Sequence, residues 1–263
     1  MEKQNVIFFD IDGTIIDGMG HIPDSAVEAI HKAQSLKNLC VVNTGRPYSH
    51  IDPKVKGIGF DGYVCSCGQH IVLNDQVVLH VEFEKDLCRE IVALTRECRL
   101  DVVYEAETGI WFDLSHEPIE PIKATYNQFE QRGFDVNRSV DKPDFCFDKL
   151  CVFVRPDSDV QPFLQFVEQY CTVIYREGDM LEIIRRGYSK ESGLKTMLRL
   201  LNVPLECSYA IGDSTNDLPM LSSVAHSIAM GNAPEEVKAV VEYVTDPLEE
   251  HGLANALGRY GLC

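Results

Sequence analysis

Two aspartates, Asp10 and Asp12, are the residues of this 263-residue sequence whose spacing most clearly suggests chemistry. In an extended chain, side chains two positions apart lie on the same side, so both carboxylates face one region of space. Two anions held that close repel each other unless a cation or a proton lies between them. Gly13 permits a tight turn close to a ligand, and Thr14 adds a hydroxyl. The stretch predicts a cation-dependent site, with an acidic surface turn as the plain alternative.

A second turn of the same construction lies near the other end of the chain. Residues 6–9 and residues 209–211 are short apolar runs, which predict strands of a parallel sheet buried on both faces. The second run leads into a polar turn that contains Asp213, Asn216 and Asp217. Two acidic turns that each end a buried strand are much less expected by chance than one.

Two further segments offer groups that could bind an anion. Residues 39–43 predict another buried strand, and Thr44, Gly45 and Arg46 follow it with a hydroxyl, an amide and a guanidinium. A plain strand-to-helix turn is the alternative there. Lys190 opens a predicted helix, which is the unfavourable end for a cation unless an anion lies ahead of it. A solvated lysine is the alternative in that case.

The composition limits the classes of partner. A net charge of −17 disfavours nucleic acids and anionic membranes, because both require a basic surface. A phosphorylated substrate would need a locally positive site, formed by a bound cation and a few basic side chains. The ten cysteines form no CxxC pair and are expected to be buried free thiols. With no signal-like start or long apolar run, the expected location is the cytoplasm.

The order of predicted elements indicates an α/β protein with an insertion. Strand, helix and strand alternate at both ends of the chain, and Ser25 with Glu28 has the spacing of a helix capping box. A hairpin is predicted over 71–79, with its turn at Asn74 and Asp75. Hairpin strands with interleaved helices predict an α+β module over 81–185, inserted into a parallel-sheet domain of residues 1–80 and 186–263. Within that module, a helix capped near Asp157 or Ser158 is expected.

The four polar segments, in this order, resemble the four motifs of the haloacid dehalogenase superfamily. They are 10-DxDGT-14, 44-TGR-46, Lys190 and 212-GDSTND-217. The inserted module resembles the type C2B cap of the Cof-like sugar-phosphate phosphatases, and the similarity spans the whole chain. The resemblance implies a Rossmann-like core with an inserted α+β cap. Two positions depart from the usual pattern: Cys67 stands where many relatives have Asn, and Glu191 stands where Gly is frequent.

The resemblance implies a role for each motif residue. Asp10 would be the nucleophile that forms an aspartyl phosphate, and Asp12 the acid and base. The phosphoryl oxygens would be bound by Thr44, the Gly45 amide and Lys190, with Asn216 beside them. Mg²⁺ would be held by Asp10, the Asp12 carbonyl and Asp213, with Asn216 and Asp217 supporting the metal or the lysine. The ligand atoms are hard oxygens, which favour Mg²⁺ over zinc.

The expected activity is hydrolysis of a small phosphorylated metabolite, with a sugar phosphate as the family-level expectation. A phosphosugar mutase and a non-catalytic phosphate-binding regulator are the alternatives. Specificity is expected on loops of the inserted module, near 105–109 and 176–179 or near Arg185 and Arg186. His70 and His80 have no partner pattern and are expected to be structural or surface residues.

Overall fold

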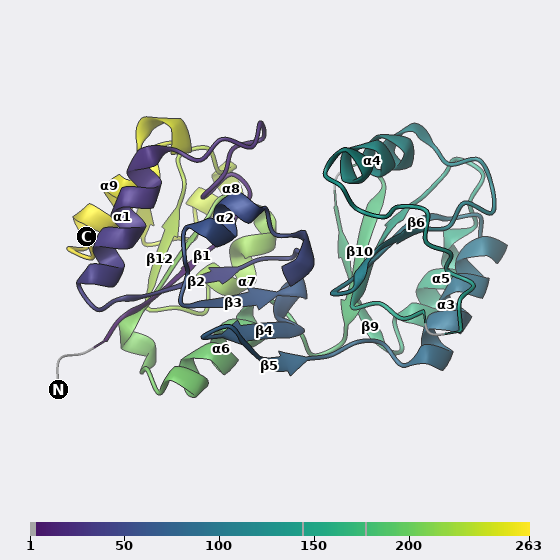
Figure 1. Cartoon of the computed structure of the whole chain (residues 1–263), viewed down its shortest axis with the longest axis horizontal. Helices are drawn as coiled ribbons and strands as arrows, with labels where there is room; N and C mark the ends of the chain where they lie inside the picture. Colours follow the sequence, from purple (N-terminus) through teal and green to yellow (C-terminus); the bar gives the residue numbers. More distant parts are fainter. Residues whose placement is uncertain (1–3, 144, 177) are drawn as a thin grey trace. The chain divides into compact units, whose positions relative to one another are not determined.

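A computed structural model describes residues 4–143, 145–176 and 178–263 of the chain (Figure 1). These residues divide into two compact units. The first contains residues 4–46, 51–80 and 189–263, and the second contains Pro47–His50 and the described part of Val81–Tyr188. The predicted module boundaries at 81 and 185 remain a prediction. In the described part of the chain, no helix has the length and apolarity that crossing a membrane requires.

The first unit is built on an eight-stranded sheet of order β13-β12-β11-β1-β2-β3-β4-β5. The six strands from β13 to β3 run parallel, and β4 and β5 complete the sheet as an antiparallel hairpin. Its strands are β1 Val6–Phe9, β2 Leu39–Asn43, β3 Gly62–Cys65, β4 His70–Leu73, β5 Gln76–His80, β11 Ser208–Gly212, β12 His226–Ala229 and β13 Tyr243–Val244. The predicted hairpin turn is confirmed, with positive φ at both Asn74 and Asp75, as a two-residue turn of type I′ requires.

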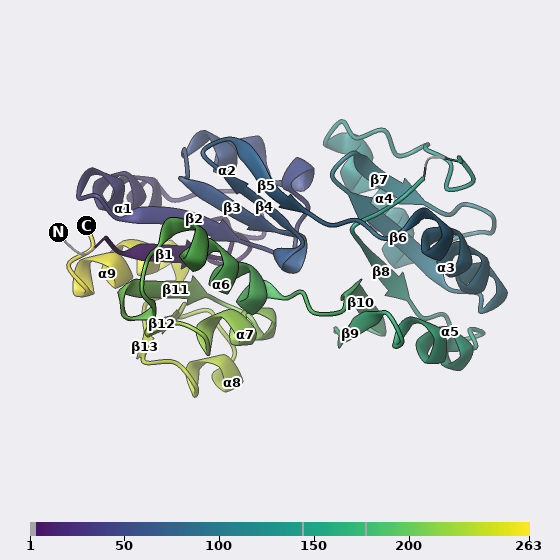
Figure 2. The same cartoon turned by 90° about the horizontal axis from the view of Figure 1, so that it is seen from below.

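Helices cover both faces of this sheet (Figure 2). They are α1 Asp24–Ser35, α2 Pro53–Gly57, α6 Lys190–Leu201, α7 Leu218–Leu221, α8 Glu235–Lys238 and α9 Gly252–Arg259. The 3₁₀ turns of this unit are η2 Ser66–Gly68, η3 Leu205–Cys207, η4 Thr215–Asp217 and η5 Leu248–Glu250. A further turn, η1 Tyr48–His50, belongs to the second unit. Val6 and Phe8 of β1 pack with Leu194 and Met197 of α6 in one apolar cluster. Since both faces are covered, a central strand is apolar throughout, which explains the unbroken run 6–9.

The polar segments meet because of the parallel register. Phe9 of β1 pairs with Ile211 of β11 and with Val42 of β2. The carboxyl ends of these three neighbouring strands therefore lie at one edge of the sheet. Asp10 follows β1, and Asp213 and Thr44 follow the other two. Segments as far apart in the chain as Asp10 and Asp213 are thus brought to one place, as the sequence predicted.

The second unit is an α+β module around an antiparallel sheet of order β7-β6-β8-β10-β9. Its elements are α3 Lys85–Glu97, β6 Asp101–Ala106, β7 Gly109–Phe112, α4 Glu120–Gln131, β8 Lys149–Phe153, α5 Val160–Val167, β9 Cys171–Tyr175 and β10 Met180–Arg185. The predicted α/β class with a separate antiparallel module is therefore confirmed.

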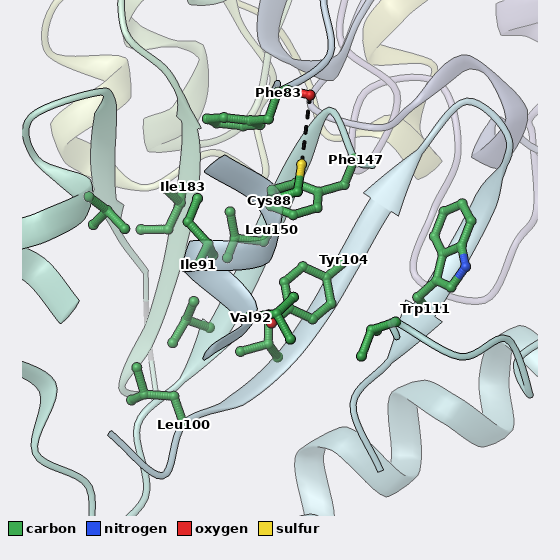
Figure 3. Close-up of a cluster of buried hydrophobic side chains, with 14 of the residues drawn as sticks. Phe83, Cys88, Ile91, Val92, Leu100, Tyr104, Trp111, Phe147, Leu150 and Ile183 are labelled. Atoms are coloured by element: carbon green, nitrogen blue, oxygen red, sulfur yellow. Dashed lines mark hydrogen bonds between the residues drawn. The ribbon is translucent and has the colours of Figure 1, made fainter. Parts of the chain in front are cut away.

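One face of this second sheet packs against α3 and α5 (Figure 3). Tyr104 lies at the centre of this cluster, with its ring centroid 5.0 Å from that of Phe147. The buried Tyr104 hydroxyl shares a 2.9 Å hydrogen bond with Thr95, so the polar atom is not left unpaired. Trp111, the single tryptophan of the chain, belongs to the same cluster and is 7% exposed.

A buried ionic network occupies three strands of this sheet. Lys149 Nζ lies 2.5 Å from Glu182 Oε1 and 3.4 Å from Glu105 Oε2. Arg176 donates to the second oxygen of Glu182 from Nε, at 3.0 Å, and from Nη2. Burial alone would raise the pKa of Glu182, but Lys149 and Arg176 outweigh it and lower that pKa to about 2. The carboxylate is thus ionised and paired on both of its oxygens.

Two predicted helix caps are wrong. Helix α1 begins at Asp24 without a side-chain cap, because the Ser25 hydroxyl bonds His251 Nδ1 at 2.8 Å instead. Helix α5 begins after Asp159, which makes no side-chain cap bond. The Ser158 hydroxyl bonds the Arg99 carbonyl. In both cases a tertiary partner competes successfully for the hydroxyl that local spacing assigned to a helix end.

The ionic network predicts a large effect of an isosteric substitution. Glu182→Gln removes the anion from between two cations, and breaking a buried pair in this way costs about 3–5 kcal/mol. Urea unfolding followed by the fluorescence of Trp111 measures the change, because that residue lies in the same unit.

The matched control is Glu117→Gln, which removes an exposed carboxylate 2.9 Å from Lys123 and should change the free energy of unfolding by about 0–1 kcal/mol. The difference between wild type and Glu182→Gln should shrink as the pH falls from about 4.5 to about 2, because the carboxylate of the unfolded chain takes up a proton over that range while the native one stays ionised until the pH nears 2. Equal effects of the two variants would contradict this account.

Candidate active site

A buried lysine lies between two aspartates at the edge where β1 and β11 end. Lys190 Nζ is 2.6 Å from Asp10 Oδ1 and 2.6 Å from Asp217 Oδ1. Asn216 Oδ1 is 3.4 Å from the same nitrogen. Lys190 is 3% exposed, so the alternative of a solvated lysine is excluded. An anion does lie ahead of this helix start, which removes the electrostatic objection to a cation there.

The second acidic turn is organised by Asp217. Its Oδ2 atom accepts hydrogen bonds from the backbone amides of Asp213 and Ser214, both at 3.1 Å. Its other oxygen binds Lys190. A Cβ atom on Gly212 would lie 2.6 Å from the Asp217 carboxyl carbon, so only glycine permits this close approach. Asp217 therefore holds both the turn and the lysine.

The electrostatic balance of the site is negative. Burial, and then the charge of Asp217, raise the pKa of Asp10 above its usual range. The same two causes, in the same order, raise the pKa of Asp213 to about 7. Burial would lower the pKa of Lys190, but Asp10 and Asp217 outweigh it, so the pKa is raised and the lysine is charged. One ammonium does not neutralise three carboxylates.

The donor set fits a hard divalent cation. Asp10, Asp213 and Asp217 each place a carboxylate oxygen within 4.8 Å of the others. Asp213 Oδ1 is buried and has no hydrogen-bond partner among the described residues, and a buried acceptor without a partner costs free energy. Oxygen ligands with no nitrogen or sulfur are typical of Mg²⁺ sites.

The turn after β2 brings Asp12 a partner. Arg46 donates to Asp12 Oδ2 from Nε at 2.8 Å and to Oδ1 from Nη2 at 2.5 Å. Thr44 is 1% exposed, and its hydroxyl accepts the Arg46 amide at 3.2 Å. Gly45 lies between them. The structure thus places all the predicted motif residues at one sheet edge, whereas their individual roles remain predictions.

Two asparagines at this edge of the sheet support the site and were not predicted from the sequence. Asn43, the last residue of β2, donates to the Lys190 carbonyl at 2.9 Å and so holds the start of α6. Asn232 donates to the Gly13 carbonyl at 2.9 Å, which fixes the first acidic turn. A buried amide at the end of an apolar strand was a usable signal for Asn43. No local sequence pattern around Asn232 indicated this role.

Helix α6 reaches the site through a close backbone contact. A Cβ atom on Gly193 would lie 2.8 Å from the Gly68 Cα atom and would overlap Val64. Gly68 has φ +89, and a Cβ there would overlap the Ser189 carbonyl oxygen. The two glycines therefore allow the first turn of α6 to lie against η2. The helix is further fixed by a capping box that Ser189 forms with Ser192.

Cys67 and Glu191, the two residues that differ from the usual motif pattern, lie in different environments. Cys67 has φ +52, a left-handed conformation that asparagine tolerates better than most residues. The Cys67 amide donates to the Thr44 carbonyl at 3.2 Å, so its backbone bonds to the turn that begins at Thr44. Glu191 accepts an exposed bond from Lys195.

The predicted specificity residues of the inserted module fall into separate groups. Glu105 and Arg176 belong to the buried network around Lys149. Arg185 binds Glu84 at 2.7 Å, and Arg186 bonds a backbone carbonyl. Their roles in specificity remain a prediction.

Comparison with known proteins decides the family. Residues 7–257 match the haloacid dehalogenase-like hydrolases. The chain belongs to this family. It is a haloacid dehalogenase-type phosphatase of the Cof-like group, whose substrates are small phosphorylated metabolites.

Two bacterial relatives match along nearly their full length. YkrA of Bacillus subtilis strain 168, provisionally named as a phosphatase, is 27% identical over 262 residues, with 98% of each chain covered. The HMP-PP phosphatase of Yersinia enterocolitica is 26% identical, with 96% of this chain and 93% of that protein covered.

Solved structures share the fold. BT1666 of Bacteroides thetaiotaomicron, described among phosphatases of the superfamily, aligns with a TM-score of 0.85 at 24% identity, covering 99% of this chain and 96% of that one. BT4131, described as a subclass IIB sugar phosphatase, aligns with a TM-score of 0.82 at 24% identity, covering 99% and 100%.

The glycine contact predicts a selective loss of activity. Gly193→Ala should displace the first turn of α6 and with it Lys190, and a shift of about 1 Å at a catalytic group can reduce the rate by about 10²-fold. Phosphate release by the purified variant measures the effect. Gly258→Ala is the matched control, because this helical glycine has open space at its Cβ position. A loss of activity in both variants, or in neither, would contradict this role of Gly193.

Proposed function

We propose that this phosphatase hydrolyses the phosphate monoester of a small metabolite, with a sugar phosphate as the first candidate, through a phosphorylated Asp10. The observation that carries the proposal is the contact of buried Lys190 with Asp10 and Asp217, beside Asp213. A carboxylate held against an ammonium at the end of a buried strand can serve as a nucleophile whose target oxygens are also neutralised.

In the first step, an Asp10 carboxylate oxygen attacks phosphorus and the bond to the leaving oxygen breaks. Asp12 transfers a proton to that oxygen, so the product leaves as an alcohol. The Thr44 hydroxyl, the Gly45 amide and Lys190 bind the phosphoryl oxygens, with Asn216 beside the lysine at 3.4 Å. The step conserves charge and ends with an acyl phosphate on Asp10.

In the second step, water attacks the phosphorus of the aspartyl phosphate. Asp12, now a carboxylate, accepts a proton from the water. Asp10 leaves as a carboxylate, and inorganic phosphate is released. The two steps use the same pair of carboxyl groups in opposite directions, which explains why two aspartates are needed two positions apart.

The rate enhancement that phosphate monoester hydrolysis requires is too large for a single catalytic effect. Phosphate monoesters hydrolyse so slowly that the enhancement can approach about 10²¹, or ~28 kcal/mol. Positioning supplies about 7–11 kcal/mol of this, and an acid-base group worth about 10²–10⁴ supplies roughly 3–5 kcal/mol. More than ~10 kcal/mol remains for charge stabilisation and the covalent route.

Mg²⁺ would be held by the Asp10 and Asp213 carboxylates and the Asp12 carbonyl. Asp217 supports this set indirectly, because its oxygens bond Lys190 and two backbone amides. When bound, the ion would neutralise charge on the phosphoryl oxygens and relieve the repulsion among the carboxylates.

A phosphate-release screen over sugar phosphates, with and without EDTA, tests the proposal. Turnover should require the divalent cation, and Asp10→Asn should reduce it to below a few per cent while the protein stays folded. A mutase would release little phosphate unless a bisphosphate form is supplied, and a binding protein would release none. Appreciable activity of Asp10→Asn would refute the assignment of the nucleophile.

The metal site predicts a stability change that needs no substrate. Mg²⁺ at a hundred times its Kd should stabilise the native state by about 2.7 kcal/mol, measured as a rise in Tm. Asp213→Asn should abolish this rise and leave the metal-free protein at least as stable, because a half-buried acid beside two other carboxyl groups is removed. Glu235→Gln, whose side chain is 92% exposed, is the control and should keep the full response. An undiminished rise in Asp213→Asn would contradict the ligand assignment.

A further inference from the structure

We propose that Arg46 is a positioning residue that orients the Asp12 carboxyl group for proton transfer. This inference rests on the proposed function of Asp12. It differs from the interpretation of Arg46 as part of a phosphate cradle, which the spacing of residues 44–46 suggested. The two interpretations predict different kinetic effects.

The geometry favours orientation of a carboxylate. Two nitrogens of one guanidinium, Nε and Nη2, each face a different oxygen of Asp12, at 2.8 and 2.5 Å. This side-on, two-point contact fixes the plane of the carboxyl group as well as its distance. A single point charge would fix only the distance.

Asp12 needs such a partner because little else restrains its side chain. Its carboxyl group is 56% exposed, although Asp10 two positions earlier is buried. The backbone of the turn is held by bonds to the Ile11 and Ile16 carbonyls. Its side-chain torsions are not fixed by these bonds. The negative charges of Asp10 and Asp213 repel Asp12 and, without a counter-charge, would favour rotamers that point away from the reacting centre.

The Arg46 backbone is held on both sides by bonds within the first unit. Its amide donates to the Thr44 hydroxyl at 3.2 Å. Its carbonyl accepts the Ser66 amide at 2.9 Å. A restrained backbone is the condition under which a long side chain can position another group.

Stability does not explain the pair. A salt bridge with one partner 32% and the other 56% exposed is well solvated and contributes little to stability. Proton transfer from a well-placed acid contributes about 10²–10⁴ in rate. The pair therefore contributes more to catalysis than to stability, and substitution of Arg46 should lower kcat.

The test compares Arg46→Ala, Arg46→Lys and Asp12→Asn on two substrates. One is an alkyl phosphate, either glucose 6-phosphate or the best substrate of the screen, and the other is 4-nitrophenyl phosphate. The alkyl leaving group needs a proton, whereas nitrophenolate leaves readily without one. Arg46→Ala should lower kcat for the alkyl phosphate by about 10²-fold and for the nitrophenyl ester much less. KM and inhibition by inorganic phosphate should stay within about twofold, since positioning acts on kcat.

Arg46→Lys is the decisive variant, because it keeps the charge and loses the two-point geometry. It should remain as slow as Arg46→Ala on the alkyl phosphate. Arg199→Ala is the control, because its exposed guanidinium bonds the Thr196 hydroxyl on the same helix at 3.0 Å. This variant should leave both rates unchanged. Thermal melting confirms that each variant is folded.

Four results would overturn the inference. Full rescue by Arg46→Lys, or a large rise in KM and in the phosphate inhibition constant, would show that Arg46 binds the phosphoryl group. Equal losses on both substrates would show that it does not act through the acid. A leaving-group effect in Asp12→Asn without one in Arg46→Ala would leave the proposed function intact and refute only the role of Arg46. Failure of the proposed function itself would appear separately, as turnover by Asp10→Asn.

Discussion

One buried ammonium placed between carboxylates is the interaction on which the site depends. Lys190 is 3% exposed and touches Asp10 and Asp217 at the same distance, 2.6 Å. A lysine at such a site without anions would lose its charge, and the aspartates without the lysine would repel one another. The buried Asp213 Oδ1 atom, which has no hydrogen-bond partner among the described residues, marks the place where the proposed divalent cation would bind. The proposed binding of an anion and of a cation would thus both follow from one arrangement.

The fold supplies this arrangement through parallel register and close backbone packing. Three neighbouring strands end at one edge, so side chains from distant segments converge there without long loops. The contact between Gly68 and Gly193 then allows a helix to approach the same edge and deliver Lys190. The second unit has its own apolar cluster and its own ionic network, around Lys149 and Glu182. The second unit therefore has packing and ion pairs that are separate from those of the active site.

Much of the fold could be predicted because its signals are local. An apolar run such as 6–9, bounded by polar residues, indicates a buried strand wherever it occurs, and Asn74 with Asp75 indicates a tight turn by backbone preference alone. The site was predictable where a motif places several polar groups together, as at Asp213 and Asp217. Individual helix caps were not, because the Ser25 hydroxyl has a partner 226 positions away.

The remaining site residues act through contacts that no local pattern contains. Asn232 supports the first acidic turn from the far end of the chain, and Gly193 matters only because Gly68 lies against it. Arg46 was visible as a cation, but its partner was not, since a guanidinium serves a phosphate and a carboxylate equally well. Chemical type could be inferred from sequence, whereas pairing required the structure.

The most direct test of the account is the mass of the protein itself during turnover. After rapid mixing with substrate and Mg²⁺ and an acid quench, intact mass spectrometry should show a fraction of the chain heavier by one phosphoryl group, and borohydride reduction followed by peptide mapping should place it on Asp10. Phosphate release with no labelled chain at any time in a single turnover, or a label on another residue, would contradict the central claim.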